Sequence, residues 1–164
     1  MDRIDDARCW ATQRAAGTVR IMLEIEPLLE DLEGAIAEHD TAYAMYLARE
    51  YVLRCAAILS MCRGGPVDID NSLTTADVFT NLPDSLVSQL ADLALAPVQG
   101  GDITDPGWLD ALRELLRQVQ TALGIDSLPL IRTREGMFPA LAAARDAVDL
   151  CVALGGPVVA VPSS

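Results

Sequence analysis

Lysine is absent from this chain of 164 residues, in which all twelve basic residues are arginines. Without a lysine amine, the chain can form no Schiff base and has no lysine general base. Histidine occurs once, as His39, which excludes di-iron bundles built on paired Glu-x-x-His motifs and zinc hydrolases. Asp68 and Asp70 alternate like cation ligands, but no Gly and distal Glu complete an EF-hand loop. We therefore expect neither a metal nor a cofactor.

Closely paired cysteines and long apolar runs are also missing. The four cysteines show no Cys-x-x-Cys spacing, and the N-terminal residues MDRIDDARCW contain no apolar signal region. The longest apolar stretches fall well short of the roughly 20 residues that a membrane-spanning helix needs. These absences predict reduced, mostly buried thiols in a cytoplasmic protein that does not enter the membrane.

Aromatic residues make up only 4% of the chain and hydrophobic residues 51%, so the core must be aliphatic. The formal net charge is −12 and the sequence pI about 4.3. Such a chain repels a phosphate backbone and anionic membranes, which disfavours nucleic-acid binding. The charge suits cationic ligands or basic partners.

Apolar residues recur in steps of three and four along most of the chain, which is typical of amphipathic helices. The pattern predicts an all-α fold, a single domain over 1–164 that forms a bundle of five to seven helices. We expect a first helical stretch to about Ile36, which Pro27 either kinks or splits. Further helices are predicted at about 41–63, from about 75, from 84 or 85 to 95, at 106–123 and at 137–154, followed by a short C-terminal tail from about 155 that docks on the bundle.

Turn residues mark the ends of these helices. Asp40 or Thr41 is predicted to cap the helix at 41–63, and Asp84 or Ser85 the helix that ends near 95. Asp105 followed by Pro106 is a strong helix start. The glycines in RGGP and Gly124 follow two predicted helix ends, where glycine readily adopts the left-handed backbone conformation.

The helix at about 41–63 is apolar on nearly all sides between 51 and 62, which predicts a buried, central position. Its polar residues Tyr43, Tyr46, Glu50 and Arg54 follow steps of three and four and so share one face. One interpretation is an ion pair between Glu50 and Arg54 at the rim. The other is a stripe that lines a cavity, where the tyrosines supply contact area and the ion pair orients a polar ligand. These four residues and His39 are the candidate ligand-binding residues, and catalytic residues stay unknown.

The segment REYVLRCAAILSMCRGGP, followed by TADVFTNLPDSLVSQLADLAL, resembles the C-terminal helical, substrate-binding domain of aminoglycoside nucleotidyltransferases over about residues 49–96. In that family a long helix ends in a Gly turn, and a loop, a short helix, a Leu-Pro and another helix follow. The Gly-Ser signature and paired aspartates of the family's catalytic domain are absent from this chain. Ala57 and the DNSL loop stand where the family often has Arg and Lys. The resemblance implies a substrate-binding helical module without nucleotidyl transfer of its own.

Three functions fit these observations. The preferred one is a non-catalytic binding module for a cationic or amphipathic small molecule, or for a protein partner. The second is a small cofactor-free enzyme of secondary metabolism, such as a cyclase, isomerase or transferase, that uses Tyr43, Tyr46, Glu50, Arg54 or His39 for acid–base chemistry. The third is a subunit that buries an apolar helix face in a homodimer.

Overall fold

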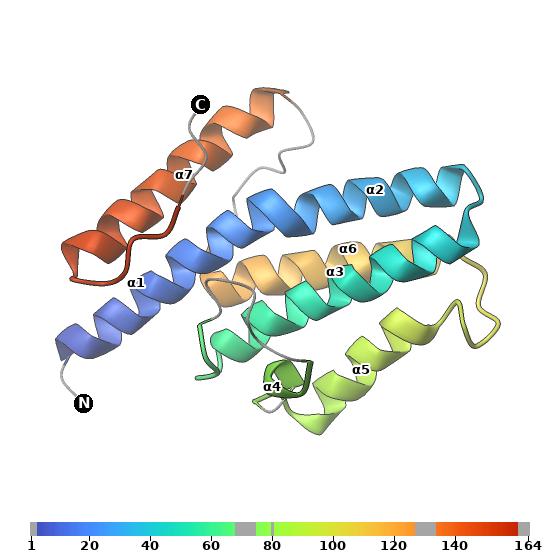
Figure 1. Ribbon diagram of the computed structural model, residues 1–164, viewed down its shortest axis with the longest axis horizontal. Coiled ribbons are helices and arrows are strands. Elements are labelled where there is room, and N and C mark those ends of the chain that lie inside the picture. Colours follow the sequence, from blue (N-terminus) through green and yellow to red (C-terminus); the bar gives the residue numbers. More distant parts are fainter. Residues whose placement is uncertain (1–2, 68–74, 80, 127–133, 161–164) are drawn as a thin grey trace.

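The computed structural model describes residues 3–67, 75–79, 81–126 and 134–160 (Figure 1). Within these ranges the chain is helical and contains no strand, which confirms the predicted all-α bundle. Asp68 and Asp70 lie outside the described residues. The elements are α1 (Arg3–Arg20), η1 (Ile21–Ile25), α2 (Glu26–Ala37), α3 (Thr41–Met61), α4 (Thr75–Phe79), α5 (Asp84–Leu95), α6 (Pro106–Leu123) and α7 (Arg134–Ala153).

Elements α1, η1 and α2 follow one another without a break and form one long rod (Figure 1). Pro27 lies in the first turn of α2, and it lacks the amide hydrogen that an α-helix needs. Directly before it, η1 widens into a π-helical turn, and the amide of Glu26 donates to the carbonyl of Ile21, five residues back. The sequence left open whether Pro27 kinks or splits this stretch. The rod in fact continues, because a π-helical turn accommodates the irregularity.

Helix α3 occupies the centre of the bundle, as predicted. It packs against η1, α2, α4, α5 and α6, and more than half of its residues are buried. At its start the side chain of Asp40 accepts a hydrogen bond from the amide of Tyr43 at 3.0 Å, which confirms this residue as the cap. At its end Gly64 adopts φ +90°, and the amide of Gly65 donates to the carbonyl of Ser60, which is a Schellman ending.

The ends of α5 and α6 give one correction and one confirmation. Neither Asp84 nor Ser85 caps α5, because the extended residue before the helix is Pro83 and no side chain caps it. Asp84 is instead the first helical residue, where its charge favours the helix dipole. Asp105 caps α6 by accepting from the amide of Gly107 at 2.9 Å, and Gly124 follows the helix with φ +67°.

Helix α7 begins at Arg134, three residues before the start predicted at about 137. The stretch REGMF is part of the helix, although Pro139 lies inside it. This proline removes only one backbone hydrogen bond, and the helix gains packing from Ala140 and Ala144, which are fully buried. After α7 the tail docks through the buried Val159, as predicted, while residues 161–164 lie outside the described residues.

Buried side chains form two separate clusters. The main core joins η1, α2, α3, α4, α5 and α6, and leucine and isoleucine are its commonest residues. A second, smaller core lies between α1 and α7 and includes the start of η1 and the tail (Figure 1). Its members are Ala11, Ala15, Val19, Met22, Ala140, Ala144, Ala147, Val148, Cys151 and Val159.

Candidate functional site

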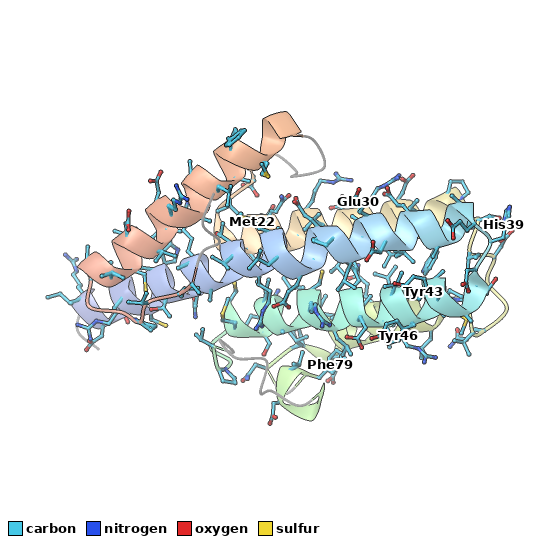
Figure 2. All side chains as sticks on the ribbon, turned by 45° about the horizontal axis from the view of Figure 1, so that its top comes forward. Met22, Glu30, His39, Tyr43, Tyr46 and Phe79 are labelled. Atoms are coloured by element: carbon cyan, nitrogen blue, oxygen red, sulfur yellow. The ribbon has the colours of Figure 1, made fainter. Side chains whose placement is uncertain are left out.

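Two of the predicted site residues, Tyr43 and Tyr46, form a stacked aromatic pair on the first turns of α3. Their ring centroids are 6.4 Å apart and the ring planes differ by 11°. Both residues are exposed, to 47% for Tyr43 and 57% for Tyr46. Figure 2 shows the two side chains on the outward side of α3. The pair therefore presents a flat, accessible aromatic surface.

Further along the same face, Glu50 and Arg54 form the predicted ion pair, with Nη1 of Arg54 2.6 Å from Oε2 of Glu50. The guanidinium also reaches another element, because its Nε lies 3.2 Å from Oε2 of Glu24 in the π-helical turn. Arg20 lies 3.7 Å from the same Glu24 oxygen. The side chain of Arg54 is 32% exposed, so this charge network lies at the rim of the bundle. Of the two interpretations, the structure supports the ion pair at the rim.

The contact between Glu24 and Arg54 also fixes which carboxylates of α2 lie beside the tyrosines. The two helices run antiparallel, so two turns along each one from this contact bring Asp31 level with Leu47. Asp31 shares the helix face of Glu24 by its spacing and is exposed. By this register Asp31 of α2 lies on the same side of the helix pair as the tyrosines, and along α3 the tyrosines lie between the cap residue Asp40 and Glu50.

His39 lies in the turn between α2 and α3, as Figure 2 shows, and it is exposed. Its backbone adopts φ +59°, the left-handed region, and the amide of Asp40 donates to the carbonyl of Ala35. His39 therefore fills the position of a helix ending that glycine usually takes. Asp102 in the loop before α6 lies near it. Hydrogen bonds from Thr104 lower the pKa of Asp102, and His39 adds a smaller electrostatic contribution.

Two hollows occur elsewhere on the bundle. The larger lies between α3, α5 and α6, and the smaller is lined by Arg20, Leu23 and Glu24 of the long rod together with Val159 and Ala160 of the tail. None of the five predicted site residues lines either hollow. The structure therefore brings Tyr43, Tyr46, Glu50 and Arg54 together as a surface stripe, which we call the tyrosine stripe, and leaves His39 in the turn beyond its end.

Sequence reasoning missed Glu24 and Asp31 as parts of this surface. Both lie on the polar side of the first helical stretch, and a single sequence does not show which face of α2 meets α3. The sequence did contain one signal: Glu24 and Asp31 are two helical turns apart, so they share one face of the first helical stretch. Only the antiparallel pairing of α2 with α3 turns that spacing into a shared site.

The cysteines fit the predicted role of inert thiols. Cys55 and Cys151 are buried and Cys62 is half-buried, whereas Cys9 is exposed. Burial raises the pKa of both Cys55 and Cys62. The neighbouring Tyr51 and Arg63 act in the opposite direction but with smaller effect. Neither thiol is therefore prepared as a nucleophile at neutral pH.

Two further observations concern the described part of the chain. No helix there is both long enough and apolar enough to cross a lipid bilayer. No group of three or more His, Cys, Asp and Glu side chains in that part is arranged to hold a metal ion.

Comparisons with known proteins give no family assignment. No family model matches the chain, and no curated protein or solved structure is significantly similar to it. The resemblance of residues 49–96 to the helical domain of aminoglycoside nucleotidyltransferases thus stays a prediction.

Proposed function

We propose that this protein is a non-catalytic binding module and that its tyrosine stripe recognises a cationic, amphipathic ligand. The observation that carries the proposal is the stacked, half-exposed pair of Tyr43 and Tyr46 among carboxylates. An organic cation over an aromatic face gains about 0.5–1 kcal/mol at an exposed site. Stacked rings with acidic neighbours can supply this interaction and a charge-assisted hydrogen bond to the same ligand.

Arg54 does not oppose a cation on this surface, because it belongs to a network in which Glu24 and Glu50 balance the charges of Arg20 and Arg54. Its guanidinium contacts Glu50 and Glu24, at 2.6 and 3.2 Å. Asp31 and Asp40 then add negative charge beside the tyrosines, and the net charge of −12 attracts cations over longer distances. The local and the overall electrostatics therefore favour the same sign of ligand.

The alternative function, a cofactor-free enzyme, would need acid–base groups held away from water. The outward position of the two tyrosines favours binding over such catalysis. The resemblance to a substrate-binding helical module agrees with the proposal, but it covers only Glu50 and Arg54 of the tyrosine stripe. A cytoplasmic location and the absence of nucleic-acid binding are parts of the same proposal and rest on the sequence.

The test is calorimetric titration with benzyltrimethylammonium, a cation with an apolar ring, and with its uncharged analogue neopentylbenzene. We expect saturable binding of the cation only. Replacing both tyrosines by alanine (Tyr43→Ala with Tyr46→Ala) should abolish it, whereas replacing both by phenylalanine should preserve it because the aromatic faces remain. Asp92→Asn removes an exposed charge on α5 and serves as the control.

Arg54→Leu separates the two interpretations of the charge network. We expect the fold to persist and the cation to bind about twofold to threefold more tightly, because Glu50 loses its guanidinium partner while Glu24 keeps Arg20. A melting temperature tens of degrees lower, with unchanged binding, would show that the ion pair is purely structural.

Equal binding by the alanine and phenylalanine double variants of Tyr43 and Tyr46 would refute the tyrosine stripe as the site.

A further inference from the structure

A second surface of the molecule has the opposite local charge. The hollow between α3, α5 and α6 has a volume of about 500 Å³, within the range of small-molecule sites. Its apolar part comes from Leu59 of α3, Leu86 of α5 and Ala122 of α6. This arrangement offers an aliphatic surface that the ends of three helices share.

The polar lining of the same hollow is mainly cationic. Arg63 and Arg117 both line it, in a chain where acidic residues outnumber basic ones by two to one. Arg117 pairs at 2.8 Å with Glu114, which is the single carboxylate among the residues that line the hollow. Arg63 donates to the backbone carbonyl of Leu59 at 3.0 Å, and no carboxylate of the described residues pairs with it. The hollow therefore carries a guanidinium whose charge is not neutralised within the described structure.

Neutral hydrogen-bonding groups complete the lining. Gln118 and Thr121 project from the same side of α6 as Arg117, at helical spacing. An amide and a hydroxyl beside two guanidinium groups can bind the two oxygens of a carboxylate. Because the apolar residues lie in the same hollow, a ligand there gains from both kinds of contact.

We propose that this hollow binds a small amphipathic carboxylate, with its aliphatic part against Leu59, Leu86 and Ala122. The carboxylate then lies beside Arg63 and Arg117. This site is separate from the tyrosine stripe, which lies on the outward face of α3 and takes a cation, so each proposal can fail without the other. The overall negative charge opposes an anion at long range, and the apolar contacts are therefore essential to binding.

The test is calorimetric titration of the intact chain with octanoate and with octanol, its uncharged analogue. We expect saturable one-to-one binding of octanoate, and binding of octanol weaker by about tenfold because it makes no charge-assisted hydrogen bonds. The double variant Arg63→Gln with Arg117→Gln should reduce octanoate binding to the level of octanol. Arg49→Gln removes the same charge from an exposed position of α3 outside the hollow and should change nothing.

A second pair of variants tests the apolar part. Ala122→Trp fills the hollow from an exposed position of α6 and should abolish binding of both probes. Ala91→Trp places the same ring on an exposed position of α5 outside the hollow and should leave binding intact. No saturable heat with octanoate, or octanoate binding that survives both the double arginine variant and Ala122→Trp, would overturn the proposal.

Discussion

The main core and the smaller core between α1 and α7 are built from different side chains. The main core uses leucine, isoleucine and valine together with Tyr51 and Trp108, both of which also donate hydrogen bonds to backbone carbonyls. In the smaller core half of the side chains are alanine. Alanine allows two helices to approach closely but removes little apolar area from water, so it contributes less free energy for each residue that is ordered.

The smaller core compensates in part with polar contacts to the tail. Nε of Arg8 donates to the carbonyl of Leu154 at 2.8 Å, and the thiol of Cys151 donates to the carbonyl of Pro157 at 3.3 Å. The first contact holds the turn after α7 against α1, and the second holds the tail against α7. We infer that α7 and the tail can detach from α1 while the main core stays folded, as regions with few large apolar contacts open first.

The largest expected effect is in the main core. Leu112→Ala removes a fully buried side chain of α6 and should lower the free energy of unfolding by about 2–5 kcal/mol, measured by urea denaturation. Leu95→Ala, at a partly exposed position of α5, is the control and should cost about 1 kcal/mol or less. Equal losses for the two variants would contradict the assignment of the main core as the source of stability.

A smaller and more local effect is expected between α1 and α7. Ala144→Leu overfills the smaller core and should cost about 1–3 kcal/mol. Because α7 packs on α1, hydrogen exchange should become faster in 134–160 while the amides of α3 keep their protection. Ala142→Leu, on the exposed side of α7, is the matched control. Faster exchange throughout α3 would show that the two cores unfold as one unit.

Much of this architecture was predictable because local rules decide it. The steps of three and four, the cap at Asp40, and the glycines after α3 and α6 each follow from interactions within a few residues of chain. The differences at α5 and α7 arose where two local signals compete: at α5 Asp84 follows a proline, and α7 contains Gly136 and Pro139 near its start.

The tyrosine stripe was predictable as a face of one helix but not as a site. Its spacing placed Tyr43, Tyr46, Glu50 and Arg54 together, and the structure confirms that they share a face. Whether this face points inward or outward depends on which neighbours cover α3, and long-range packing determines that. The contact of Arg54 with Glu24 has the same origin, because it joins residues of two helices.

The smallest expected effect is at His39. This residue lies in the turn between α2 and α3, at a distance from the α1–α7 pair that forms the smaller core (Figure 1). Its left-handed backbone costs an L-residue roughly 1–2 kcal/mol, and glycine avoids this cost but loses more conformational entropy on folding. His39→Gly should therefore raise the free energy of unfolding by about 1 kcal/mol or less, measured by urea denaturation. Binding of benzyltrimethylammonium should stay unchanged, because the imidazole lies beyond the tyrosine stripe. His39→Ala keeps the backbone cost and removes the ring, so weaker binding by both variants would instead place the imidazole in the ligand site.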